Sequence, residues 1–190
     1  MVIKSEDVRF FEEIRLSGSG GQGLITAGII LAKSAVYKGI RVTQTQSYGP
    51  ESRGGASRAD VIMSDTEFFY PEATSFDILL CLTQEACDKY APNLKEDGIL
   101  IVDSTLVKNI SMINNKIYEL PFTNIAHEKL GSILPTNIIS LSFLVRKTDI
   151  ICEKSLKKAI KTTMKARHID MNLKAMKIGF KLADEYNSED

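Results

Sequence analysis

The sequence contains few of the residues that metal binding and acid–base catalysis require. Its 190 residues include no tryptophan, three cysteines and two histidines. Cys81, Cys87 and Cys152 form no Cys-x-x-Cys pair. The chain therefore has neither the spacing of a structural zinc site nor the four thiolates that hold an iron–sulfur cluster. We predict no metal ligands and no catalytic residues in this chain.

The charge balance excludes further classes of partner. Lys and Arg number 24, Asp and Glu number 24, and the isoelectric point is about 6.7. A protein without net positive charge has no field that attracts nucleic acid or anionic lipid. No apolar run approaches the roughly 18–20 residues of a membrane span, and Met1–Phe11 lacks the apolar core of a signal peptide. We expect a cytoplasmic protein that binds neither nucleic acid nor membrane.

Strand-like and helix-like segments alternate along the chain, whose length predicts a single domain over residues 1–190. Apolar or alternating patterns predict six strands, at Glu13–Ser17, Ile40–Gln46, Arg58–Ser64, Asp77–Leu82, Gly98–Asp103 and Lys116–Leu120. A helical period predicts helices at Leu24–Tyr37, Asn137–Val145, Glu153–Lys165 and from Ile169 onward. The pattern favours a three-layer α/β/α sandwich with a mixed, mostly parallel sheet and a helical C-terminal third.

The third strand is expected to depart from parallel order. Only the residues from Ser47 to Ser57 separate it from the second strand, and they show no helical pattern. A parallel crossover usually needs a dozen or more residues and a helix. We therefore predict that the third strand is antiparallel to its neighbour or displaced in the sheet.

A glycine-rich loop follows the first strand and precedes the first helix. Its sequence matches G-x-G-x-x-G in the strand–turn–helix context of a phosphate-binding loop. Glycines let a ligand approach the backbone, and the N-terminus of a helix attracts an anion. The predicted anion-binding or inter-subunit residues are Gly18, Gly20, Gly21, Gln22 and Gly23.

Dinucleotide binding also requires an acidic residue at the end of the second strand, about 20 residues beyond the glycines. This position offers Thr43, Gln44, Thr45 and Gln46 instead. The sequence therefore disfavours NAD(P) or FAD binding. A stand-alone nucleotide- or anion-binding regulatory domain remains an alternative.

A second polar loop follows the second strand. It contains Tyr48, Glu51, Arg53, Gly54 and Gly55, which complete the set of candidate site residues. Because both loops follow strands of the same direction, we expect them at one edge of the sheet, where open α/β sheets bind ligands. Arg53 offers a planar fork for a carboxylate or phosphate. An ordinary surface turn is the alternative interpretation of this loop.

The two loops together, Gly18–Leu24 and Gln46–Ser57, resemble the gamma subunit of 2-oxoacid:ferredoxin oxidoreductases. Pro135–Ile139 and Asn172–Phe180 are similar to further segments of that family, so the resemblance covers most of the chain. It implies an accessory subunit without a complete active site, in an enzyme that oxidises a 2-oxoacid to an acyl-CoA.

The resemblance also implies partners and cofactors. In the family, alpha, beta and in some cases delta subunits accompany this one, and ferredoxin accepts the electrons. Thiamine diphosphate, magnesium, iron–sulfur clusters and coenzyme A serve the complex, and we expect none of them on this chain alone. We also expect the isolated chain to be able to form homo-oligomers. Phe68–Tyr70 are candidate contacts with partner subunits, and packing onto the local core is the alternative interpretation of these residues.

The substrate is suggested by the second loop alone. Glu51–Ser57 looks more like the 2-oxoglutarate branch of the family than like the pyruvate branch. Pyruvate, branched-chain 2-oxoacids and indolepyruvate remain open as alternatives.

Overall fold

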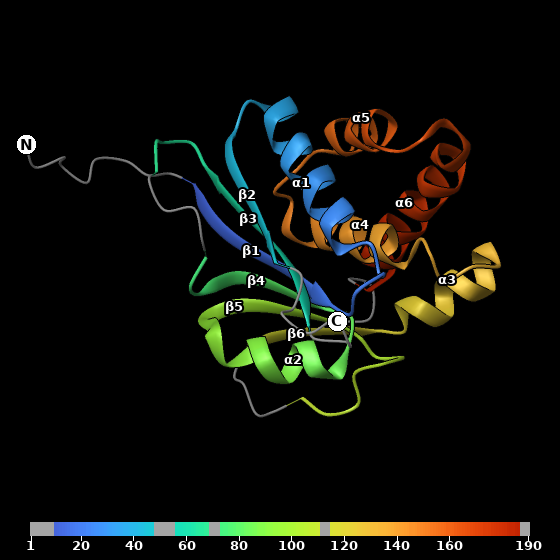
Figure 1. The fold of residues 1–190 in the computed structure, drawn as a ribbon, viewed down its shortest axis with the longest axis horizontal. Coiled ribbons are helices and arrows are strands. Elements are labelled where there is room, and N and C mark those ends of the chain that lie inside the picture. The colour runs from blue at the N-terminus through green and yellow to red at the C-terminus, as the bar shows by residue number, and fades with distance from the viewer. Residues whose placement is uncertain (1–9, 48–55, 69–72, 111–114, 187–190) are drawn as a thin grey trace, which may run out of the picture.

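The computed structural model describes residues 10–47, 56–68, 73–110 and 115–186. These residues form one six-stranded sheet with helices on both faces (Figure 1). The strands are β1 (Phe11–Gly18), β2 (Arg41–Ser47), β3 (Ser57–Ser64), β4 (Phe76–Cys81), β5 (Leu94–Asp103) and β6 (Lys116–Leu120). All six strands that the sequence predicts are therefore confirmed, with shifts of their ends.

The helices are α1 (Leu24–Lys38), α2 (Gln84–Tyr90), α3 (Phe122–Leu130), α4 (Thr136–Thr148), α5 (Glu153–Thr163) and α6 (Ala166–Tyr186), and a 3-10 turn, η1 (Ala91–Asn93), follows α2. The sequence predicts α1, α4, α5 and α6. It does not predict α2 and α3, which have seven and nine residues. Two turns of helix are too short for a periodic apolar pattern to stand out.

The strand order of the sheet is β2-β3-β1-β4-β5-β6. β1, β4, β5 and β6 pair in parallel, whereas β3 is antiparallel to both of its neighbours, β2 and β1. The mixed, mostly parallel sheet and the reversed third strand are thus both confirmed. Strand β3 runs back antiparallel to β2 and lies between β1 and β2.

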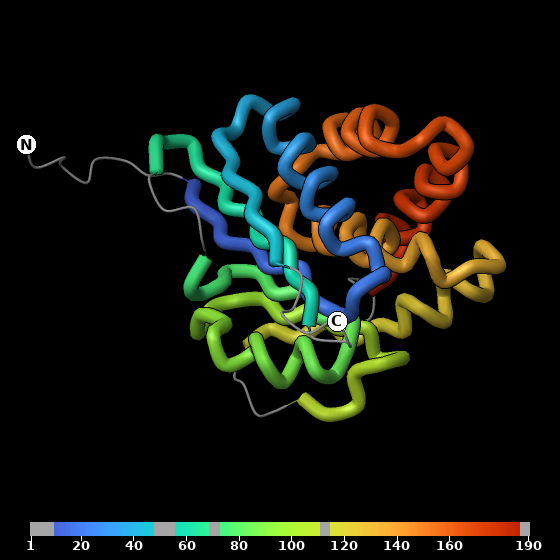
Figure 2. Tube along the Cα trace, viewed as in Figure 1, coloured from blue at the N-terminus to red at the C-terminus, as the bar shows by residue number. Residues whose placement is uncertain are grey.

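The two faces of the sheet are covered unequally. Figures 1 and 2 show α1, α4, α5 and α6 on one face and the short α2 on the other. Helix α4 is the central element of the thick layer, since every residue from Thr136 to Val145 is buried. Helix α1 lies close to β3, because a Cβ atom added at Gly28 would lie 2.8 Å from the Cβ atom of Ala59.

A buried ion pair joins β1 to β3. Arg15 and Asp60 are opposite one another in the register and are 4% and 2% exposed. The guanidinium donates from Nε and Nη2 to the two carboxylate oxygens, at 2.6 and 2.7 Å. It also lies against the rings of Phe76 and Tyr90, with its Cζ atom 4.1 and 4.6 Å from their centroids. These contacts give a desolvated charge pair the hydrogen bonds and cation–π contacts that its burial requires.

We predict that Asp60→Asn lowers the free energy of unfolding by about 3–5 kcal/mol, because the substitution leaves the Arg15 charge buried without its counter-charge. The double variant Arg15→Met, Asp60→Leu removes both charges and should recover most of that loss. Urea unfolding of the three proteins measures this coupling. If Asp60→Asn alone lowered the free energy of unfolding by less than about 1 kcal/mol, the buried ion pair would contribute no more than a solvent-exposed one.

Candidate functional site

The ends of β1 and β2 and the start of β3 lie at one edge of the sheet. Gly18 is opposite Ser57, and Ser47 is opposite Arg58. The predicted placement of both loops at one edge is therefore confirmed for the residues that anchor them. The remaining candidates of the second loop lie outside the described residues, so their positions stay a prediction: Tyr48, Glu51, Arg53, Gly54 and Gly55.

The glycine loop has a backbone that only glycine adopts easily. Gly21 and Gly23 have φ angles of +86° and +74°, in the left-handed region. At Gly23, a Cβ atom would also lie 2.5 Å from Nδ2 of Asn137. This position therefore requires glycine for two separate reasons, whereas a Cβ atom added at Gly20 would meet no other atom within 4 Å.

Gln22 closes the loop from within. Its Oε1 accepts the backbone N–H of Ser19 at 2.7 Å, and its Nε2 donates to the carbonyl of Leu82 at 3.4 Å. On sequence grounds Gln22 is a candidate anion-binding or inter-subunit residue. In the structure both ends of the amide already have partners in the chain, so Gln22 shapes the loop and holds it against the end of β4.

Helix α1 begins directly after the loop. Its N-cap is Gly23, which has no side chain to cap the first turn. Nδ2 of Asn137 donates to the carbonyl of Gly23 at 2.9 Å and so fixes the loop to α4. The first backbone N–H groups of a helix lie outside its i to i−4 ladder and carry its positive end. This part of the edge therefore has the polarity that suits an anion.

The strand order argues against a dinucleotide at the same loop. Because β3 lies between β1 and β2, the end of β2 is two strand spacings from the glycine loop, about 9–10 Å. The residues there, Thr45 and Gln46, carry no carboxylate for a ribose hydroxyl. Both the missing acid and the inserted strand disfavour the dinucleotide interpretation.

The cysteines are not arranged for a cluster. Cys81 is buried beside Ser17 and Cys87 is buried on the same face of the sheet, the α2 face, whereas Cys152 is exposed at the start of α5. Burial raises the pKa of the Cys81 thiol well above its usual value, and a hydrogen bond with Cys81 lowers the pKa of Cys87. Across the described residues, no three His, Cys, Asp or Glu side chains gather in a way that could hold a metal ion.

Asp103 is a buried polar residue that the sequence did not single out. It ends β5 with no exposed surface. One carboxylate oxygen accepts the N–H of Thr105 at 3.0 Å, and the other accepts the hydroxyl and, at 3.1 Å, the N–H of Thr123. The carboxylate therefore caps the first turn of α3 from the end of the strand. Its position after a buried strand resembles that of a catalytic acid, but its hydrogen bonds serve the fold.

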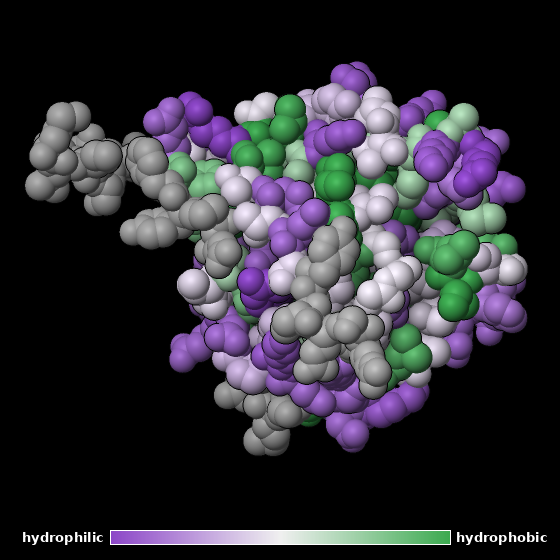
Figure 3. All heavy atoms as spheres, in the orientation of Figure 1, coloured by the Kyte–Doolittle hydropathy of each residue, from purple (hydrophilic) through white to green (hydrophobic). Residues whose placement is uncertain are grey.

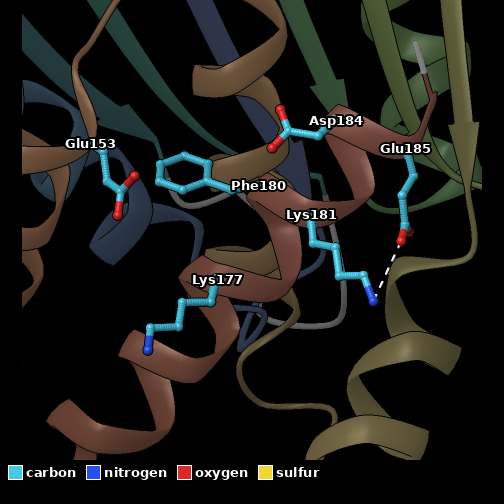
Figure 4. A pocket seen from close by; sticks show the side chains of 6 residues that line it. All are labelled: Glu153, Lys177, Phe180, Lys181, Asp184 and Glu185. Carbon is cyan, nitrogen blue, oxygen red and sulfur yellow. Dashed lines mark ion pairs between the residues drawn. The ribbon is translucent and has the colours of Figure 1, made fainter. Parts of the chain in front are cut away.

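A cavity of about 450 Å³ is lined by residues of α5 and α6 rather than by the glycine loop. Figure 4 shows charged side chains of both signs around Phe180, with an ion pair of 3.4 Å between Lys181 and Glu185. Because the opposite charges are mixed, this cavity selects neither an anion nor a cation. It does not compete with the glycine loop as a candidate site.

Phe68, a candidate partner contact on sequence grounds, packs against the protein itself. Its ring lies edge-on to Phe11 with the centroids 5.9 Å apart, and it contacts the hydrophobic cluster on the α2 face. The local-core interpretation therefore holds for Phe68. Its two aromatic neighbours in the sequence lie outside the described residues.

Comparison with known proteins gives a match over most of the chain. A family profile described as pyruvate ferredoxin/flavodoxin oxidoreductase matches residues 13–182. The 2-oxoglutarate synthase subunit KorC of Methanocaldococcus jannaschii is 42% identical over 181 residues, which cover 94% of this chain and 97% of that protein. The pyruvate synthase subunit PorC of the same organism is 30% identical over 172 residues, which cover 88% and 94%.

Solved structures give the same result. The gamma subunit of a keto/oxoacid ferredoxin oxidoreductase from Geobacter sulfurreducens superposes with a TM-score of 0.82 and 42% identity, over 90% of this chain and 98% of that one. A 2-oxoglutarate:ferredoxin oxidoreductase from Magnetococcus marinus, solved with 2-oxoglutarate, coenzyme A and succinyl-CoA, has the same fold. Its TM-score is 0.83 at 22% identity, over 95% of this chain and 32% of that one. Among the described helices, none is long and apolar enough to span a membrane.

We predict that Gly23→Ala lowers the free energy of unfolding by about 1–3 kcal/mol, because the left-handed backbone and the contact with Asn137 both oppose a side chain. Gly20→Ala is the matched control in the same loop and should stay within about 0.5 kcal/mol of the parent. Thermal or urea unfolding measures both. Equal losses in the two variants would contradict this account of the loop.

Proposed function

This chain belongs to the pyruvate ferredoxin/flavodoxin oxidoreductase family as a gamma-type subunit, and from that premise we propose that its complex oxidises 2-oxoglutarate to succinyl-CoA. The observation that carries the proposal is the difference between two subunits of one organism. The chain is 42% identical to the 2-oxoglutarate synthase subunit and 30% identical to the pyruvate synthase subunit, over similar lengths.

The chemistry of this complex belongs mainly to other subunits. Thiamine diphosphate with magnesium and the iron–sulfur clusters require ligands that the described part of this chain does not gather, since Cys152 is exposed away from the buried Cys81 and Cys87. We infer that alpha and beta subunits, and in some assemblies a delta subunit, hold these groups and pass electrons to ferredoxin. The present chain, one domain over residues 1–190, then works in the cytoplasm as an accessory part of the enzyme.

The glycine loop edge is the part of this chain that we propose acts in the complex. The uncapped start of α1 supplies a positive helix end. Ser47 and Ser57 bring both ends of the second loop to that edge. We propose that Tyr48 and Arg53 complete a polar notch there, for a phosphate group of coenzyme A or a carboxylate of the alpha subunit.

A stand-alone regulatory domain that binds nucleotides is the second candidate, and the glycine loop is the feature that favours it. Against it, Oε1 of Gln22 already accepts the N–H of Ser19, so this backbone donor is not available to a nucleotide. Tight binding of an adenine nucleotide to the purified chain would support this candidate over an enzyme subunit.

We predict that the purified chain alone shows no 2-oxoglutarate-dependent reduction of a viologen dye, because its sequence offers neither the thiolates of a cluster nor a thiamine site. Co-expression with its alpha and beta subunits should give that activity. Omitting this chain from the co-expression is the control for its contribution. Turnover by the isolated chain would contradict the assignment as an accessory subunit.

We predict that Arg53→Ala raises the KM for coenzyme A, or weakens assembly of the complex, by about ten- to hundred-fold, since a charge-assisted hydrogen bond contributes roughly 1.5–3 kcal/mol. The isolated variant should unfold like the parent, because a loop side chain contributes little to the core. Arg146→Ala is a matched control, since Arg146 is exposed and lies near the end of α4 opposite to Asn137. If Arg53→Ala changes neither quantity, the second loop is an ordinary surface turn.

A further inference from the structure

Strand β2 lies at one edge of the sheet that the described residues form. An edge strand presents backbone N–H and C=O groups that another strand can pair with, and proteins usually protect such edges with charges, proline or short length. The other edge, β6, has five residues and carries exposed Lys116 and Glu119. In contrast, β2 has seven residues, no proline and a single charge, Arg41, at its first position. The β2 edge is the less protected of the two.

An apolar stripe on α1 lies beside this edge. Ile25, Ile29, Ala32 and Val36 are spaced by four, three and four residues, so they follow one side of the helix. None of the four is fully buried, and Val36 is 59% exposed. Figure 1 shows α1 between β2 and α5, and Figure 3 shows hydrophobic residues along it.

The direction of this stripe follows from the rest of the helix. Gly28 faces β3, and Ile30 and Ser34, which the helical period places on the opposite side from the stripe, are 0% exposed. Ala32 of the stripe and Val42 of β2 both pack at the margin of the same hydrophobic cluster. The stripe therefore lies on the side of α1 toward the β2 edge, where nothing in the described part of the chain covers Val36.

The sequence of β2 is compatible with antiparallel pairing to itself. If Gln44 faces Gln44 of a second copy, then Thr43 faces Thr45, Val42 faces Gln46 and Arg41 faces Ser47. No like charges meet in this register, and threonine pairs on neighbouring strands are favourable. The backbone N–H and C=O groups of alternate residues point to the same side of a strand. Those that face outward from the sheet edge therefore belong either to residues 41, 43, 45 and 47 or to residues 42, 44 and 46. Both sets are symmetric about Gln44, so either one allows this pairing.

The same twofold axis brings the two α1 helices together. Helix α1 packs over the β2–β3 pair, so the two α1 axes would be about two strand spacings apart, roughly 9–10 Å. Packed helices lie about 8–10 Å apart. A Cβ atom at Gly28 would be 3.7 Å from Nε2 of Gln44, so Gly28 lies beside the middle of β2. Gly28 is also within about one helical turn of the middle of the apolar stripe. One axis therefore suits both elements.

We propose that β2 and the apolar stripe of α1 form the interface of a homodimer, in which β2 strands of two copies pair antiparallel about Gln44. The two sheets then continue into one another across the twofold axis, and the two stripes pack together above it. This proposal does not depend on the substrate of the complex. It assigns a second copy of this chain, and no other subunit, to the β2 edge.

The register is tested by disulfide cross-linking of the full chain and of its assembled complex. All cysteine variants are made in a protein that carries Cys152→Ser, because Cys152 is exposed and would give its own cross-links. Facing residues of antiparallel strands have Cα atoms about 4.5–5.5 Å apart, within the range that a disulfide spans. Gln44→Cys should therefore give a covalent dimer on mild oxidation with diamide. Gln46→Cys is the matched control, since four residues of offset separate its two copies by about 13 Å.

The helix contact is tested by sedimentation over a concentration series. Val36→Glu should weaken the dimer at least ten-fold, because it buries two carboxylates between the stripes. Leu134→Glu is the control, because Leu134 is 74% exposed between α3 and α4, away from the proposed interface. This second variant should leave the dimer unchanged.

Any one of four results would overturn the proposal. The chain could sediment as a monomer at every concentration, Gln46→Cys could cross-link as readily as Gln44→Cys, or Leu134→Glu could dissociate the dimer where Val36→Glu does not. Loss of the Gln44 cross-link in the assembled complex would show that another subunit covers the β2 edge, which also contradicts it.

Discussion

The buried ion pair between Arg15 and Asp60 joins β3 to β1 in register, and the position of β3 between β1 and β2 determines where the two loops and the sheet edge lie. With β3 in this place, β1 carries the glycine loop at the centre of the sheet while β2 moves to the edge. A desolvated charge pair is costly without its partner, so the contact specifies one neighbour for β1 and excludes the direct β1–β2 pairing of a dinucleotide-binding sheet. The two aromatic rings around the guanidinium complete its environment.

The insertion changes what the glycine loop can do. A dinucleotide needs the glycine turn and the end of the second strand side by side, and here a reversed strand separates them. The loop is also closed by Gln22 and fixed to α4 through Asn137. What remains is a weakly polar edge with an uncapped helix start. Such an edge suits one anionic group or a partner surface, which agrees with the accessory role that we propose for this chain.

Local patterns in the sequence predict most of the fold, and contacts between distant residues account for the rest. Apolar strands and the short link from Ser47 to Ser57 predict the mixed sheet, because both are local properties. Helices α2 and α3 escape prediction because two turns give no clear period. The pairing of Arg15 with Asp60 spans 45 residues and that of Gly23 with Asn137 spans 114, so no local pattern reveals them. The role of Gln22 is hidden for the same reason, since its amide bonds to Leu82 across 60 residues.

We propose that this chain serves a complex specific for 2-oxoglutarate. The most direct test of this proposal is purification of the native complex through a tag on this chain, followed by measurement of kcat/KM for 2-oxoglutarate, pyruvate, a branched-chain 2-oxoacid and indolepyruvate. We expect a thiamine-containing subunit to co-purify in an amount equal to that of this chain. We also expect kcat/KM to be highest with 2-oxoglutarate. Recovery of the chain without any such subunit, or a clear preference for another 2-oxoacid, would contradict the proposal.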